Sequence, residues 1–97
     1  MYTLRVDWVP FVEFEFDEAK SLANKSKHGI DFVEVQEIWL DEMFVEIPAR
    51  TEDEPRFMVV GVISGKHWSA VITYRDDRVR IISARRARVE EVAIYES

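Results

Sequence analysis

The sequence predicts an α+β domain with one N-terminal strand, two helices, four strands in an antiparallel meander and a final helix. Apolar and polar residues alternate over residues 11–16 and 67–74, which is typical of half-buried strands. Between these segments, Asp17 and Asp31 each precede a stretch of helical periodicity and are suited to cap a helix. The chain has room for one core, so residues 1–97 are expected to form a single domain.

The first helix is predicted from Glu18 to about Lys27 or His28, after a capping Asp17 and before a Gly29 that ends it in a left-handed turn. Its core stripe is expected to consist of Ala19, Leu22, Ala23 and Ser26. One polar face is expected at positions i, i+4 and i+7, formed by Lys20, Asn24 and Lys27.

The second helix is predicted over residues 31–40. Asp31 at its N-cap and Glu34 three residues later form a capping-box pattern. The side chains expected to face the core are Phe32, Val35, Ile38 and Trp39. This helix is interpreted as structural throughout.

Four strands and one helix are predicted in the rest of the chain. The strands are expected at residues 43–48, 56–63 and 67–74 and from Arg78 onward, and the helix near residues 89–96. Residues 56–63 form the most apolar of these strands, which favours a position inside the sheet.

Positive charge is concentrated in residues 75–88, which contain six Arg and two Asp, a net of +4. Residues 1–56 contain six Lys or Arg and fourteen Asp or Glu, a net of −8, and the whole chain carries −6. Six Arg beside one strand indicate either a solvated rim or a seat for an anion such as phosphate. The acidic half can attract a basic protein partner, although a solvated acidic surface is the commoner explanation.

Composition excludes several classes of function. The absence of Cys excludes disulfides and thiolate sites, and two His that share no motif predict neither a metal site nor a cofactor. No apolar stretch reaches the roughly 18 residues that span a bilayer, and no signal-peptide pattern is present, so a cytoplasmic protein is expected. The net negative charge argues against indiscriminate binding to nucleic acid.

Two sets of residues, one toward each end of the chain, point to a known family. The first set is Phe14-Glu-Phe-Asp17, Lys20, Asn24, Lys27-His28-Gly29-Ile30 and Phe32. The second set is Arg56, Gly61, Val71-Ile-Thr-Tyr74, Arg80-Ile-Ile-Ser-Ala-Arg85, Ala87, Glu91 and Tyr95. In this order and spacing they resemble the BrnT family of type II toxins, RelE-like ribonucleases paired with a BrnA-type antitoxin. Residues 1–11 form an N-terminal extension relative to this family.

The resemblance implies a RelE-like fold and metal-independent cleavage of RNA that inhibits translation, with an antitoxin as protein partner. Any contact with DNA is expected only indirectly, through the antitoxin, because no helix of this chain has a basic recognition face. Such cleavage requires deprotonation of the 2′-OH, stabilisation of the pentacovalent phosphate and protonation of the departing 5′-oxygen. Positioned cations often contribute most to the stabilisation of the phosphate's charge.

The residues expected to carry this chemistry fall into four groups. The phosphate clamp is assigned to Arg56, Arg80 and Arg85, and proton transfer to Lys27 or His28. Tyr95 is expected to orient the substrate or donate a hydrogen bond. Further RNA contacts are assigned to Lys20, Asn24 and Arg86, and Glu91 is expected to hold an arginine in place.

Each assignment has a structural alternative. Arg80 and Arg85 can form ion pairs with Glu15 or Glu91, which contribute about 0–1 kcal/mol when exposed, and Tyr95 can serve packing alone. The last helix also lacks the Lys and Arg in which the family is rich, and Arg88 replaces its usual Ser or Thr cap. These departures favour a second function, a catalytically weak BrnT-like binding module that acts in a toxin–antitoxin complex or in operon autoregulation.

Overall fold

The computed structural model describes residues 12–50 and 53–97, so the expected N-terminal extension, the start of the first predicted strand and two residues of the 49–54 loop lie outside the described residues. In chain order the elements are β1 (Phe14–Glu15), α1 (Glu18–His28), the 3-10 helix η1 (Glu34–Leu40), β2 (Val45–Ala49), β3 (Arg56–Ile63), β4 (Lys66–Arg75), β5 (Arg78–Arg86) and α2 (Val89–Glu96). The predicted α+β class is confirmed.

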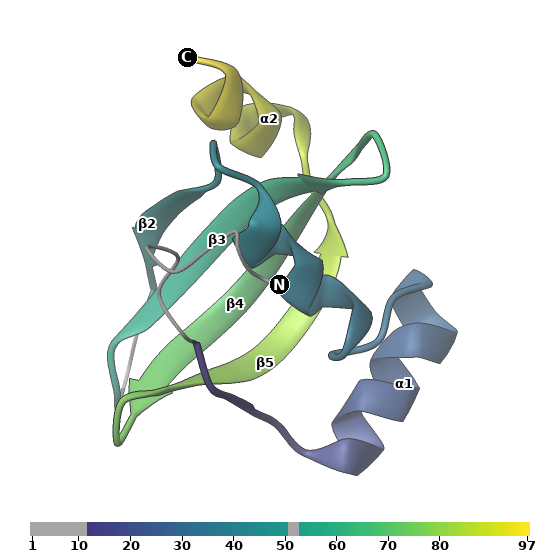
Figure 1. Cartoon of the computed structure of the whole chain (residues 1–97), viewed down its shortest axis with the longest axis vertical. Coiled ribbons are helices and arrows are strands. Elements are labelled where there is room, and N and C mark those ends of the chain that lie inside the picture. The colour runs from purple at the N-terminus through teal and green to yellow at the C-terminus, as the bar shows by residue number, and fades with distance from the viewer. Residues whose placement is uncertain (1–11, 51–52) are drawn as a thin grey trace.

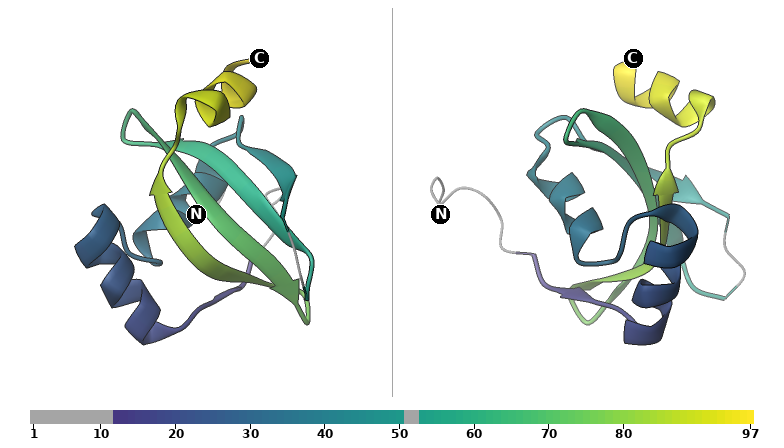
Figure 2. Two further views of the ribbon diagram at one scale, coloured as in Figure 1. Left: turned by 180° about the vertical axis from the view of Figure 1, so that it is seen from behind. Right: turned by 90° about the vertical axis from the view of Figure 1, so that its right-hand side faces the viewer.

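The five strands form one sheet in the order β1-β5-β4-β3-β2, as Figure 1 shows for its four longer strands. β1 is parallel to β5, and every other neighbouring pair is antiparallel. Figure 2 shows η1 against one face of the sheet, α1 beyond the β5 edge and α2 beyond one end of the strands. We call the face under η1, which carries Ala70 and Ile72, the covered face. The opposite face, which carries Ser69 and Thr73, is the open face.

The hydrophobic core lies between η1 and the covered face. Its buried members are Ile30, Phe32, Val35, Ile38, Val59, Ala70, Ile72, Val79, Ile81 and Ala84. This confirms the predicted core residues of the second helix, and Trp39 packs against the same cluster with its ring centroid 4.9 Å from that of Phe14. Burial of this apolar surface is the main force that holds η1 on the sheet.

The second predicted helix is shorter than expected and is a 3-10 helix. Asp31 Oδ1 accepts from the Glu34 N–H at 2.7 Å, and Glu34 Oε1 accepts from the Asp31 N–H at 2.9 Å, which confirms the predicted reciprocal capping contacts. The buried residues Phe32, Val35 and Ile38 recur every three positions. That spacing matches the three residues per turn of a 3-10 helix, so η1 brings Val35 and Ile38 onto the sheet in line with Phe32, which lies in the turn before it.

The boundaries of α1 are as predicted, but its buried face is not. Asp17 Oδ1 accepts from the Lys20 N–H at 3.0 Å, and Gly29 ends the helix with φ of 82°. The predicted core stripe is wrong, because Ala19, Leu22, Ala23 and Ser26 are all exposed and Leu22 is 69% exposed. The buried residues of α1 are Ser21 and Asn24. The helix docks beside the edge of β5, where unpaired backbone groups require polar partners.

Asn24 closes the free edge of β5. β1 pairs only with Val79 and Arg80, so the backbone of Ala84 has no strand partner on that side. Asn24 Nδ2 donates to the carbonyls of Ala84 and Ile30 at 2.9 and 2.8 Å, and its Oδ1 accepts from the Ala84 N–H at 3.3 Å. Asn24 therefore does not share the solvent-facing surface of Lys20 and Lys27, and its predicted contact with RNA does not fit this position.

Replacing Asn24 by Ala is expected to lower the free energy of unfolding by about 2–4 kcal/mol, because three backbone groups lose their partner in a buried site. Asn24→Asp keeps the acceptor for the Ala84 N–H and loses the donor to the two carbonyls, so its free energy of unfolding should also be lower than that of wild type. Lys20→Ala, on the exposed side of α1, should change stability by less than about 0.5 kcal/mol. Urea denaturation followed by circular dichroism measures all three. Equal stabilities for Asn24→Ala and Lys20→Ala would refute this role.

Candidate functional site

A bulge in β5 brings Arg80 and Arg85 to the open face. Residues five apart in a regular strand point to opposite faces of a sheet. Here Thr73 pairs with Arg80 and Ser69 with Arg85, so the interval is four residues in β4 and five in β5. The extra residue is Ile82, which has no partner in the register with β4. The bulge thereby cancels the change of face, and both arginines lie on the side opposite η1.

Arg85 is anchored by a carboxylate of α2. Its Nη1 and Nη2 donate to Glu91 Oε1 and Oε2 at 2.9 and 2.7 Å, and Nη1 also donates to the Arg86 carbonyl at 3.1 Å. Glu91 Oε1 accepts in addition from Ser69 Oγ at 2.7 Å and from the Arg88 N–H at 2.9 Å. A guanidinium has five N–H groups, so Nε and one Nη2 hydrogen of Arg85 stay free among the described residues. The predicted supporting contact of Glu91 is present.

The partners of Glu91 hold its carboxylate ionised. The hydrogen bonds from Arg85 lower the pKa of Glu91 from 4.5 to about 2, against the opposing effect of burial and with help from the Arg88 N–H and Ser69. Because the pKa is lower in the folded than in the unfolded chain, the carboxylate stabilises the fold above about pH 4.5. This contribution is lost as the pH falls from 4.5 toward 2.

The substitution Glu91→Gln is expected to lower the free energy of unfolding at pH 7 by up to about 3 kcal/mol. At pH 3 the difference from wild type should fall to about half, because Glu91 of the unfolded wild-type chain is then protonated while that of the folded chain is still ionised. Urea denaturation at both pH values measures this. Glu90→Gln, at an exposed neighbouring position, serves as control and should match wild type at both. If the loss of unfolding free energy in Glu91→Gln is the same at pH 7 and pH 3, the charge of Glu91 does not contribute to stability.

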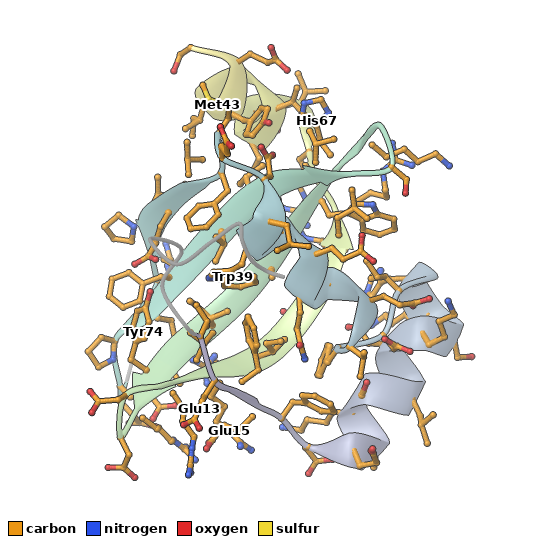
Figure 3. The ribbon with its side chains drawn as sticks, in the orientation of Figure 1. Glu13, Glu15, Trp39, Met43, His67 and Tyr74 are labelled. Carbon is orange, nitrogen blue, oxygen red and sulfur yellow. The ribbon has the colours of Figure 1, made fainter. Side chains whose placement is uncertain are left out.

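The charge at the start of β5 is neutralised by glutamates in and just before β1, the neighbouring strand of the sheet. Arg80 Nη1 lies 3.1 Å from Glu15 Oε2, and Arg78 lies 3.5 Å from Glu13 and 3.8 Å from Glu15. Figure 3 shows Glu13 and Glu15 side by side at this edge. Arg75 also pairs with a glutamate. Four of the six arginines in residues 75–88 thus face a carboxylate, so the cationic stretch is less positive than its sequence suggests.

Arg56 lies on the same face and at the same level as Arg80. Phe57 pairs with Ile72, and the next step of the register places Arg56 beside Thr73, which pairs with Arg80. Thr73 Oγ1 donates to the carbonyl of the residue before Arg56 at 2.7 Å, which agrees with this placement. With strands about 4.8 Å apart, the backbones of Arg56 and Arg80 are about 10 Å apart across β4. Arg56 is exposed.

Tyr95 of α2 is tied to the end of η1. Its hydroxyl donates to Asp41 Oδ2 at 2.6 Å, an oxygen that also accepts from the Val62 N–H at 2.8 Å. The bond to Asp41 raises the pKa of Tyr95 to about 12. Burial raises the pKa of Asp41, but hydrogen bonds from Tyr95 and from two backbone N–H groups outweigh this effect and lower it. The phenol therefore stays protonated at neutral pH.

His67 extends this contact between α2 and the sheet. Its ring meets that of Tyr95 edge to face with centroids 5.1 Å apart, and its Nε2 lies 3.0 Å from Glu96 Oε2. Figure 3 shows His67 where β4 begins, below α2. Side-chain contacts thus hold α2 both to the sheet, through Glu91 with Arg85 and Ser69 and through Glu96 with His67, and to the end of η1, through Tyr95 with Asp41.

The other predicted site residues lie around the end of β5. Lys27 and His28 close α1, whose C-terminal end lies at the same end of the sheet as that of β5 in Figures 1 and 2. Lys20 is exposed near the N-terminal end of α1, opposite the end that carries Lys27 and His28. Arg86 lies 5.5 Å above the Trp68 ring and donates to the His67 carbonyl at 3.3 Å, so it belongs to the covered face and not to the face of Arg85.

Comparison with known proteins assigns the chain to a family. Residues 16–91 match the family model described as the ribonuclease toxin BrnT of type II toxin–antitoxin systems, which is 76 of the 97 residues. The chain belongs to this family. None of the curated proteins compared with it matches. Membership brings a ribonuclease toxin activity, an RNA target and an antitoxin that neutralises the toxin.

Several residues around the BrnT site were not predicted. Asp41, Ser69 and His67 make the contacts that hold α2, yet in the sequence each resembles an ordinary residue of a helix or strand. For one of these residues the sequence offers a usable signal: Asp41 directly follows Leu40, the last apolar residue of η1. In the described part of this BrnT chain, no helix is long and apolar enough to cross a membrane, and no three acidic or histidine side chains gather as metal ligands.

Proposed function

We propose that this BrnT toxin is a RelE-like ribonuclease that cleaves RNA on the open face of its sheet. The bulge at Ile82 carries the proposal, because it aligns Arg80 and Arg85 on one face and each is anchored by a carboxylate. The antitoxin neutralises this activity. Metal independence and inhibition of translation are part of the proposal on the ground of the resemblance to RelE-like ribonucleases.

Arg85 is assigned to the scissile phosphate. Its bidentate bond with Glu91 fixes the guanidinium plane, and two N–H groups stay available for phosphate oxygens. A preorganised cation of this kind stabilises the charge that develops on the pentacovalent phosphate without rearrangement during the reaction.

Arg80 and Arg56 are assigned to the flanking RNA backbone. Ser69 and Thr73 are four residues apart in β4, so their partners Arg85 and Arg80 are separated by about 13 Å along the sheet. This spacing suits contacts with different phosphates of one strand better than a single clamp. Arg56, level with Arg80, extends the same track.

Proton transfer is assigned to Lys27 or His28, which end α1. This helix docks on β5 through the bond from Asn24 to the carbonyl of Ala84, the residue before Arg85. Its C-terminal end lies at the same end of the sheet as that of β5 (Figure 2).

Tyr95 orients the site instead of acting as a base, since a phenol with a pKa of about 12 is not deprotonated near neutral pH. Lys20 remains a candidate for an outer RNA contact, whereas Arg86 lies on the covered face beside Trp68 and not on the face proposed to bind RNA. Asn24 positions the end of α1 against β5 and does not contact RNA.

Regulated expression of the chain in a bacterial host tests the proposal, with growth and total RNA integrity as readouts. Growth arrest with loss of RNA is expected, and coexpression of the antitoxin should restore growth. Normal growth and intact RNA from a soluble, folded chain would contradict ribonuclease activity.

The pairing of four arginines with glutamates favours one alternative function. If the pairs persist in the complex with RNA, the open face carries little free positive charge. The chain would then be a catalytically weak binding module that acts in the toxin–antitoxin complex or in operon autoregulation. The same growth experiment separates the two functions, because a binding module leaves RNA intact.

A further inference from the structure

A pocket of about 350 Å³ lies away from the proposed RNA track, between η1, the β3–β4 turn and α2. Its walls include the apolar side chains of Leu40, Val62 and Ile63, together with the ring of Tyr95. Leu40 is 73% exposed at its rim. None of Arg56, Arg80 and Arg85 lines it, although Tyr95, which is proposed to orient the site, belongs to its wall.

The two chain segments that border this pocket, one around η1 and the other α2, are acidic. Residues 31–46 contain six Asp or Glu and no Lys or Arg, and α2 contains three Glu and no Lys or Arg. Glu37 and Asp41 contribute carboxylates to the lining. Asp41 is already bonded to Tyr95 and the backbone, whereas Glu37 is exposed and has no ionic partner among the described residues.

A second exposed apolar side chain, Met43, lies next to the pocket, in the turn between η1 and β2. Met43 is 68% exposed, two residues after Asp41, whose Oδ1 accepts from the Met43 N–H at 2.9 Å. Glu42 between them is exposed as well. Leu40 and Met43 thus present apolar surface within a rim of carboxylates, a combination typical of protein interaction sites.

We propose that this pocket docks a segment of the antitoxin in which Lys or Arg alternates with apolar residues. The long stem of such a cation packs on Leu40 and Val62, and its charged head reaches the carboxylate of Glu37. RNA is disfavoured there, because its phosphates would meet carboxylates. A second copy of the chain is disfavoured too, because a two-fold contact would place the same acidic surface against itself.

This inference rests on the proposed function only in that it takes the antitoxin as the partner. It places the docking site on a surface separate from the arginines of the open face. Binding of the antitoxin and cleavage of RNA should therefore be separable by mutation.

Isothermal titration of the full chain with its cognate antitoxin tests the proposal. Glu37→Lys and Leu40→Ser are each expected to weaken binding about tenfold or more, and the wild-type affinity should fall with added salt. The matched controls Asp53→Lys and Leu22→Ser introduce the same residues at exposed positions elsewhere and should bind as wild type does. RNA cleavage by all four variants should be unchanged.

Four results are decisive. Wild-type affinity in both pocket variants, or equal losses in the controls, would overturn the docking site. A change in self-association by sedimentation without a change in antitoxin affinity would assign the pocket to a second copy and would overturn it as well. Lost antitoxin binding in the pocket variants of a chain that never cleaves RNA would support docking and reject only the ribonuclease proposal.

Discussion

Arg85→Ala is expected to abolish growth arrest and to reduce RNA cleavage by about 10²- to 10³-fold, the usual effect of removing one group that stabilises transition-state charge. The side chain has two roles in this structure, since it offers two free N–H groups on the open face and neutralises Glu91. The single variant therefore also leaves a buried carboxylate unpaired, which can cost about 3–5 kcal/mol of stability.

The double variant Arg85→Ala/Glu91→Gln separates activity from folding. It removes both charges of the pair, so it should be more stable than Arg85→Ala while remaining inactive. Arg78→Ala is the matched control, because Arg78 is an exposed arginine of the same strand that pairs with glutamates. It should retain most activity. Full cleavage by the folded double variant would remove Arg85 from the site.

Gly61→Ala is expected to destabilise the fold by about 1–3 kcal/mol, because it forces extra volume into a packed interface. A Cβ at Gly61 would lie 2.8 Å from Ile38 Cγ2 and 3.3 Å from Phe44 Cβ. It would also lie 3.4 Å from Asp41 Oδ2, the oxygen that accepts from Tyr95. The substitution should thus push η1 from β3 and loosen the contact that holds α2.

A double-mutant cycle with Ile38→Ala tests the cause of this effect. If the clash is with Ile38, removing that side chain should make Gly61→Ala less costly, so the cost of the double variant is smaller than the sum of the two single costs. Thermal or urea denaturation of the four proteins gives the coupling. Strict additivity would show that the methyl group strains the backbone and not the η1 interface.

Much of the local structure follows from short-range signals. The ends of α1 and the span of β3 are as predicted, because a capping Asp, a left-handed Gly and an apolar strand act within a few residues. The capping pair of Asp31 and Glu34 was predictable for the same reason. The residue pattern that carries the BrnT resemblance also needs no tertiary information.

The tertiary structure alone decided which face of α1 is buried. Periodicity favoured Leu22 and its apolar neighbours, yet the helix docks at a strand edge, where Asn24 and Ser21 satisfy backbone groups that an apolar side chain cannot. The tertiary structure also decided the helix type of η1, which packs on the sheet as a 3-10 helix because its buried residues recur every three positions.

The site too depends on contacts that no local pattern contains. Arg80 and Arg85 share a face only because of one unpaired residue, Ile82, in the pairing of β4 with β5. The bond from Tyr95 to Asp41 joins residues 54 positions apart. The sequence by itself determined the elements, their order and the residue types available for chemistry. Their alignment was decided by strand register and by long-range hydrogen bonds, which form only when the chain is folded.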